Sequence, residues 1–204
     1  MKKTSGKQSR TIAFERAGKG KQWRWRCSFH EACHGLACAY LLHRSADLFV
    51  YSRGGGLCCL RGKGGAIDPG PHGIYALAGD IGTAMPDVPS FVECHQIPRG
   101  RFRHVRRPRR HEGLPNDAKC VEGIMAASEA LRVPEIAAIA HASWTQQATT
   151  FVVCHRREIT AIAIELYLHG HIRVPAKSEH ERWASEFDLS LYTNQAAADV
   201  LPGQ

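Results

Sequence analysis

The sequence predicts a mainly α protein of the α+β class, with a small β-hairpin or sheet beside one of its helices. In several segments apolar residues recur three and four positions apart, which is typical of helices that bury one face. The segment 47–65 instead has two short β-like runs around three glycines, which favours a hairpin. A chain of 204 residues, 44% hydrophobic and 23% charged, is long enough for one domain with a core.

The first predicted helix covers about 20–43. Its apolar side chains recur at helical spacing from Phe29 to Leu41. The hairpin follows, with β-like runs at 48–51 and 57–60 on either side of the glycines. The sequence therefore places a small sheet directly after the first helix.

Helical spacing returns after the hairpin. A second helix is expected over 71–85, and Pro86 ends it. Residues 86–115 are rich in proline and arginine and predict a long loop. Asn116 can cap the next helix, which is expected to run to about Arg132.

Two more helical segments are expected in the last third of the chain. Pro134 suits the first position of a helix, because that position needs no amide hydrogen-bond donor. A further helix is predicted over roughly 144–169, and Gly170 ends it.

The net charge of +8 is concentrated in two segments. Residues 99–110 hold seven arginines and no acid, and residues 1–10 add four basic side chains, so the remainder of the chain carries a net charge of −3. A run of this kind is either a solvated loop or a docking surface for nucleic acid, an acidic substrate or an acidic protein. Its candidate partner contacts are Arg106, Arg107, Arg109 and Arg110.

Neither a secretory signal nor a membrane span is expected. No apolar region follows the basic N-terminus, and no apolar run approaches the roughly 18–20 residues of a membrane helix. The eight cysteines form no C-x-x-C pair and are interpreted as reduced thiols. We therefore expect a cytoplasmic protein with a disordered basic tail at 1–10, one domain over 11–175 and a polar extension at 176–204.

An H-E-x-x-H motif begins at His30. Because residues four apart lie on one face of a helix, His30 and His34 can bind the same metal ion. Glu31 projects to the side, where it can act on a metal-bound water. A helix with two incidental histidines is the alternative. Ala37 and Tyr40 stand where a metzincin needs glycine and histidine, which excludes that class.

Four short segments and a closing helix follow one another in an informative order. They are H-E-A-C-H at 30–34, S-R-G-G-G-L-C-C-L at 52–60, L-A-G-D-I-G-T-A-M at 77–85, L-P-N-D-A-K-C-V-E-G-I at 114–124 and the helix at 155–172. In this order they resemble the peptidase domain of the FtsH family, the ATP-dependent zinc proteases. The resemblance covers about 25–172.

The resemblance implies a zinc-dependent endopeptidase that hydrolyses unfolded or flexible polypeptide. It implies that His30, His34 and Asp117 bind Zn²⁺ and that Glu31 is the catalytic base. The glycine-rich hairpin would line the substrate cleft, and its exposed strand edge can hold an extended peptide. The candidate substrate contacts are Gly54, Gly55, Gly56 and Leu57.

The chain also departs from the family. Cys33 replaces a glycine in the motif, and 77–85 lacks the family's arginine and glutamate. No Walker A spacing is present, so we expect no ATP binding. We also expect no membrane anchor. The chain would then be a stand-alone peptidase domain that needs a separate ATPase partner for any unfolding. Two alternatives remain: a catalytically inactive relative that binds nucleic acid or an acidic partner, and a basic DNA-binding module with a chance H-E-x-x-H.

Overall fold

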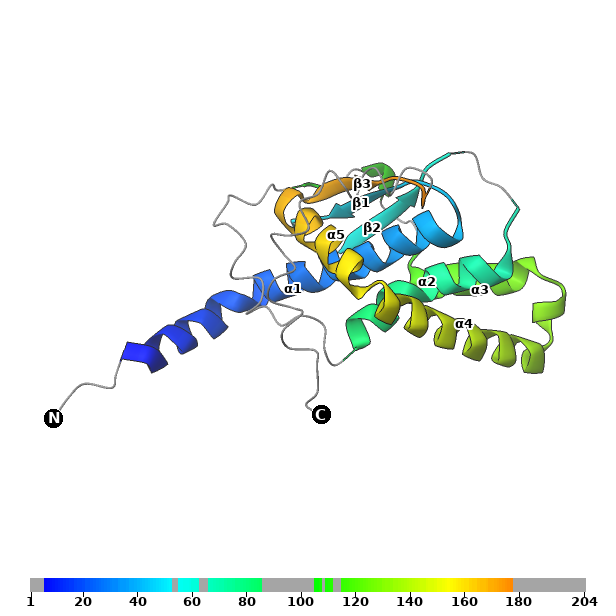
Figure 1. The fold of residues 1–204 in the computed structure, drawn as a ribbon, viewed down its shortest axis with the longest axis horizontal. Coiled ribbons are helices and arrows are strands. Elements are labelled where there is room, and N and C mark those ends of the chain that lie inside the picture. Colours follow the sequence, from blue (N-terminus) through cyan, green and yellow to red (C-terminus); the bar gives the residue numbers. More distant parts are fainter. Residues whose placement is uncertain are drawn as a thin grey trace.

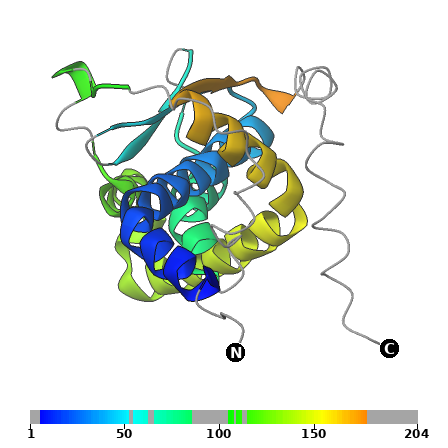
Figure 2. The same ribbon diagram turned by 90° about the vertical axis from the view of Figure 1, so that its left-hand side faces the viewer.

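A computed structural model gives the fold of this chain (Figure 1). It describes residues 6–52, 55–62, 66–85, 105–107, 109–111 and 115–177, with side chains from residue 23 onward except that of residue 111. Within these ranges the chain forms five α-helices and a three-stranded antiparallel sheet, which confirms the mainly α class with a small sheet. Figures 1 and 2 show the strands as a layer over the helices.

Two strands follow the first helix, and the third strand follows the last helix. The α-helices are α1 (Gly6–Leu41), α2 (Pro69–Ala84), α3 (Asp117–Ala127), α4 (Pro134–Cys154) and α5 (Arg156–His169). Two short 3₁₀ helices are η2 (Arg109–His111) and η3 (Ala130–Arg132). The strands are β1 (Ala46–Val50), β2 (Gly56–Leu60) and β3 (His171–Val174), in the spatial order β2-β1-β3.

Local signals in the sequence place several element ends correctly. The Asn116 side chain accepts a hydrogen bond from the Lys119 amide and so caps α3, as expected. Gly170 ends α5 in the left-handed conformation, with φ 70°. The hairpin of β1 and β2 is also confirmed, with Leu48 opposite Cys58.

Three helix boundaries differ from the predictions. Helix α1 begins at Gly6, so 6–10 are helical rather than a disordered tail, and no proline interrupts the chain up to Leu41. Helix α3 ends at Ala127, and η3 follows it. The single helix expected over 144–169 is two helices, because the chain turns at His155.

The turn at His155 lets two consecutive helices cover different parts of the molecule. Helix α4 packs on α2, whereas α5 packs on α1. Strand β3, for which the sequence showed no signal, follows α5 directly and pairs with β1. Apolar periodicity continues through the turn, so it could not reveal the change of direction.

Helix α1 is the centre of the fold and approaches the sheet closely. A Cβ atom on Gly35 would lie 2.7 Å from a Leu48 methyl carbon and 3.2 Å from one of Val174. The main core gathers buried residues of α1, β1 and α5 around this contact. The half of α1 that carries the H-E-x-x-H motif is therefore held between the sheet and the other helices.

Parts of the predicted organisation lie outside the described residues. These parts are 1–5, Gly54, most of the loop expected at 86–115, and the polar extension from residue 178 onward. Among the described helices, none combines the length and apolar character that crossing a bilayer requires.

Candidate metal centre

The three side chains expected to share a metal ion lie together. His30 and His34 project from α1, and Asp117 is the first residue of α3. The Asp117 Oδ2 atom lies 2.8 Å from His30 Nε2, and Oδ1 lies 3.3 Å from His34 Nε2. The two Nε2 atoms are 3.2 Å apart. The fold thus joins residues that are 87 positions apart in the sequence.

These spacings suit a tetrahedral ion. Ligand atoms held at about 2.0–2.2 Å from a tetrahedral Zn²⁺ lie roughly 3.3–3.6 Å from one another. The spacings of 3.2 and 3.3 Å are close to this range, and the 2.8 Å contact needs only a small adjustment. Two imidazoles and one carboxylate are also donors that zinc accepts. The residues present therefore fit this ion.

A backbone contact orients His34. Its Nδ1 atom lies 2.8 Å from the carbonyl oxygen of Tyr75 in α2, so Nδ1 donates a proton there and Nε2 is the ring nitrogen that faces His30 and Asp117. Metal-binding histidines usually have such an outer partner. Asp80 has a similar place beside His30, with 3.7 Å between Nδ1 and a carboxylate oxygen. Helix α2 thus supplies the second layer of the centre.

Helix α2 also leaves the space in which an ion can lie. A Cβ atom on Gly79 would lie 2.4 Å from His34 Nε2 and 2.7 Å from His30 Nε2. No side chain fits at this position without displacing the imidazoles. Only a glycine here allows α2 to cross the two histidines so closely.

The Asp117 carboxylate and the histidines stabilise one another's charges. Partial burial alone would raise the pKa of Asp117, but hydrogen bonds from His30 and His34 outweigh this and hold it well below its usual value. Burial opposes protonation of His34, yet the Asp117 carboxylate raises the pKa of that imidazole overall. The centre is therefore a strongly polar cluster in a mostly buried location.

Glu31 lies in the same wall of the site and is 6% exposed. Burial raises its pKa to about 8, an effect that the adjacent His30 opposes and Asp117 strengthens. A Cβ atom on Gly56, at the start of β2, would lie 2.4 Å from the Glu31 Oε1 atom. Gly56 was expected to contact substrate; the structure shows that it also makes room for Glu31.

The metal centre opens into a cleft of about 570 Å³. Besides the four site residues, the cleft is lined by the β2 segment, by α2 and by the start of α3. Gly55, Gly56 and Leu57 line it, as expected for substrate contacts, while Gly54 lies outside the described residues. Trp23 and Arg26 line it as well, about two turns and one turn before His30 on α1, respectively.

Strand β2 is an edge of the sheet. The Tyr51 amide donates to Gly55 and the Arg61 amide to Ser45, which fixes the hydrogen-bonding register of the hairpin. In this register the backbone groups of Gly56, Cys58 and Leu60 are directed away from β1. No described strand pairs with them, and Gly56 and Cys58 line the cleft.

Cys33 does not line the cleft. A Cβ atom on Gly82 would lie 2.4 Å from Cys33 Sγ, so this side chain lies in the contact between α1 and α2. Cys120, three positions after Asp117, lines the cleft instead. The outer partner Tyr75 and the close approach at Gly79 were not predicted, because neither backbone contact has a recognisable sequence signal.

The described residues of the arginine-rich run, 105–107 and 109–110, lie outside the cleft. Val105 forms an isolated parallel bridge with Tyr51, at the end of β1. Arg106, Arg107, Arg109 and Arg110 are exposed, and none of them lines the cleft.

Comparisons of the chain with protein-family models, curated proteins and solved structures find no significant match. The function therefore has to be argued from the residues and geometry of this chain.

Proposed function

We propose that this protein is a zinc-dependent endopeptidase, similar to the peptidase domain of the FtsH family, that hydrolyses unfolded or flexible polypeptide. The observation that supports this is the meeting of His30, His34 and Asp117 inside a cleft, with Glu31 beside them. Isolated H-E-x-x-H sequences arise by chance, whereas a third ligand at bonding distance from both imidazoles is a much stronger requirement.

Three protein ligands that face an open cleft are the usual arrangement of a catalytic rather than a structural zinc site. A zinc ion bound here would polarise the peptide carbonyl and acidify a water molecule. The protein's own contribution is to fix the ligands. Tyr75 orients His34, and the Asn116 cap starts α3 so that Asp117 reaches the histidines.

Glu31 is the proposed general base. It follows a ligand directly on α1 and lines the cleft, so its carboxylate can accept a proton from water and pass it to the leaving amine. Gly56 keeps the backbone of β2 beside this carboxylate. A substrate paired with β2 would therefore lie next to both the base and the ligands.

The substrate class follows from the edge of β2. An extended peptide can pair with the outward backbone groups of Gly56 and Cys58, which requires a segment free of its own secondary structure. Such pairing reads the backbone, so we expect loose sequence preference. A folded protein would need unfolding first, and a separate ATPase is the kind of partner that could supply it.

The test measures the metal content of the purified protein together with hydrolysis of an unfolded protein. Wild type is expected to hold about one zinc per chain. Asp117→Ala is expected to lose zinc and hydrolysis together. Glu31→Gln is expected to keep zinc but lose hydrolysis, because an amide cannot accept the proton. Undiminished hydrolysis by Glu31→Gln would contradict the proposed base, and a wild type that takes up no zinc would contradict the site.

A second candidate is a catalytically inactive relative that binds nucleic acid or an acidic protein. The exposed arginines outside the cleft favour it. Zinc binding without hydrolysis of any unfolded substrate would support this candidate over the peptidase.

A further inference from the structure

The sheet has a second face, turned away from the helices. Ala46, Leu48 and Val50 of β1 are fully buried under the helices. Since alternate strand residues point to opposite faces, the residues between them point away from the helices. We define the outer sheet face from this alternation and the strand register. It consists of Asp47, Phe49, Tyr51, Leu57, Cys59, His171 and Arg173, with Arg61 just after β2.

Three rings on this face form a nearly parallel row. Phe49 stacks on His171 of β3, with ring centroids 4.4 Å apart and planes at 13°. It also stacks on Tyr51, at 6.2 Å and 15°. His171 is at the end of the row, and its side chain is 46% exposed. The row therefore presents an exposed imidazole on which another flat ring can stack.

The described residues of the arginine-rich run, 105–107 and 109–110, reach this same face. The Ser52 amide donates to the Val105 carbonyl at 3.0 Å. The Arg107 guanidinium carbon lies 5.8 Å from the centre of the Tyr51 ring. The positive charge of Arg110 acts on Cys59 of the outer sheet face and opposes the rise in pKa that burial causes there. The segment is thus held across the end of the row of rings.

The face carries a large excess of positive charge. Arg173 lies on β3, and Arg106, Arg109 and Arg110 lie on the segment. None of these four forms an ion pair with a described residue. Asp47 is the only carboxylate that the strands place here, and it already pairs with Arg61.

We propose that the outer sheet face, together with the arginines at 106–110, binds single-stranded nucleic acid. Arginine donates to phosphate oxygens in a two-pronged manner, and the exposed His171 imidazole, backed by the Phe49 ring, can accept a base by stacking. The proposal uses both the arginines and the stacked rings, because phosphate binding alone would not require an aromatic surface. An acidic polypeptide would use the arginines but has no bases to stack, and a duplex keeps its bases stacked inside.

This surface shares Leu57 with the lining of the proposed peptidase cleft and otherwise lies outside it. The cleft is lined by Gly55–Cys58, α1, α2 and the start of α3, and contains none of the arginines of the segment. The inference therefore does not depend on the proposed peptidase activity, and a protein without hydrolytic activity could still show the binding.

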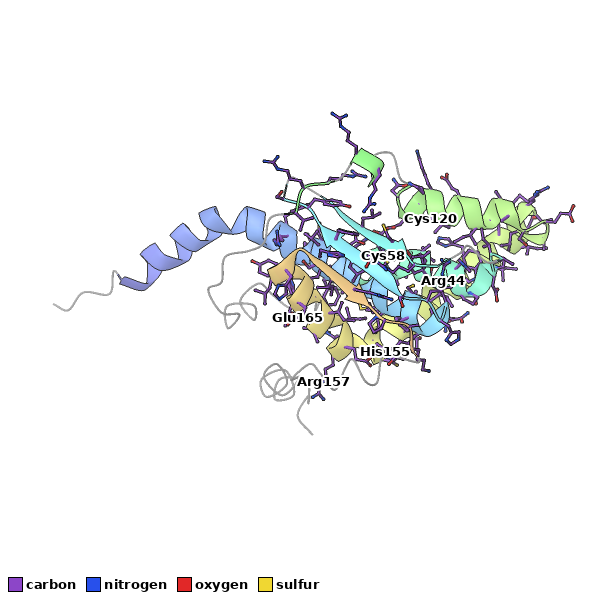
Figure 3. The ribbon with its side chains drawn as sticks, turned by 90° about the horizontal axis from the view of Figure 1, so that it is seen from above. Arg44, Cys58, Cys120, His155, Arg157 and Glu165 are labelled. Carbon is purple, nitrogen blue, oxygen red and sulfur yellow. The ribbon has the colours of Figure 1, made fainter. Side chains whose placement is uncertain are left out.

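The test uses fluorescence anisotropy with a labelled single-stranded DNA of about 20 nucleotides, longer than the roughly 4–16 that one small domain covers. The variant Arg109→Ser with Arg110→Ser is compared with Arg132→Ser with Arg157→Ser, which removes the same charge elsewhere. All four arginines are exposed, and Figure 3 shows Arg157 on α5, away from the strands. Thermal unfolding of each variant confirms that it is folded.

Binding by wild type is expected to weaken as salt rises. The slope of log affinity against log salt is expected to fall by about 1.4 in the Arg109–Arg110 variant, since each phosphate contact on a single strand contributes about 0.7. The charge-matched control is expected to keep the wild-type slope. His171→Ala is expected to weaken binding about tenfold with the slope unchanged, and His171→Tyr to restore it.

Three outcomes would overturn the proposal. Equal slopes in the Arg109–Arg110 variant and its control would mean that the segment does not touch phosphate. Wild-type affinity in His171→Ala would remove the stacking contribution. Competition by polyglutamate or by duplex DNA as effective as by single-stranded DNA would assign the surface to acidic proteins or to unspecific polyanions.

Discussion

At the scale of single residues, the metal centre depends as much on side chains that are absent as on the ligands. Gly79 lets α2 cross the two imidazoles, and Gly56 lets β2 lie against Glu31. Each is a close approach between segments rather than a turn. A glycine in a helix costs roughly 0.5–1 kcal/mol relative to alanine, so its presence in α2 at this contact has a structural reason.

We therefore predict that Gly79→Ala abolishes zinc binding, because the added carbon would lie within 2.7 Å of both Nε2 atoms. The matched control is Gly123→Ala in α3, where an added carbon meets nothing within 4 Å. The control is expected to keep zinc and to gain up to about 1 kcal/mol of unfolding free energy. Competition with a chromogenic chelator measures the zinc affinity of both variants. Wild-type affinity in Gly79→Ala would mean that α2 does not approach the centre as described.

At the scale of elements, the contact between α1 and α2 uses a small residue on one helix to admit a larger one on the other. Cys33 is buried, and its sulfur occupies the space that a side chain on Gly82 would need. The family to which we compare the motif has glycine where this chain has Cys33. Here the glycine lies on the facing helix, so the two axes can stay close.

The pair can be tested by a double-mutant cycle. Gly82→Ala is expected to lower the unfolding free energy by about 1–3 kcal/mol, because the added carbon would overpack the contact. Adding Cys33→Ala is expected to recover most of this loss, since the two β-carbons would then lie 3.7 Å apart, an ordinary contact. Urea denaturation of the four proteins measures the coupling. Strictly additive effects would show that the two positions are not in contact.

At the scale of the whole molecule, the proposed metal ligands come from segments that are distant in the sequence. His30 and His34 belong to α1, and Asp117 begins α3 after a connection of more than thirty residues that follows α2. An ion that binds only when all three meet binds the folded chain and not the unfolded one. Zinc binding at the proposed centre would therefore be linked to global stability.

Free zinc at about 100 times its dissociation constant is expected to stabilise wild type by roughly 2.7 kcal/mol. For a chain of this size that corresponds to a rise of roughly 5–11 °C in the melting temperature. Asp117→Ala is expected to show no such rise, which makes it the control for zinc bound elsewhere. Differential scanning fluorimetry with zinc and with a chelator gives the comparison. An equal rise in both proteins would place the zinc outside the proposed centre.

The sequence by itself determined the features that depend on neighbours along the chain. The helix around His30, the cap at Asn116, the end at Gly170 and the hairpin at 46–60 all follow from contacts within a few residues. The same holds for the placement of His30, His34 and Glu31 on one helix. Asp117 entered the expected ligand set only through the order of motifs, since no local pattern marks it.

The tertiary structure alone decided which distant segments meet. It set the turn at His155 that sends α5 back to α1, the pairing of β3 with β1, and the Tyr75 carbonyl that orients His34. It also decided that Gly79 faces the imidazoles. These features depend on the packing of surfaces far apart in the sequence, and apolar periodicity shows which face of an element is buried but not which partner buries it.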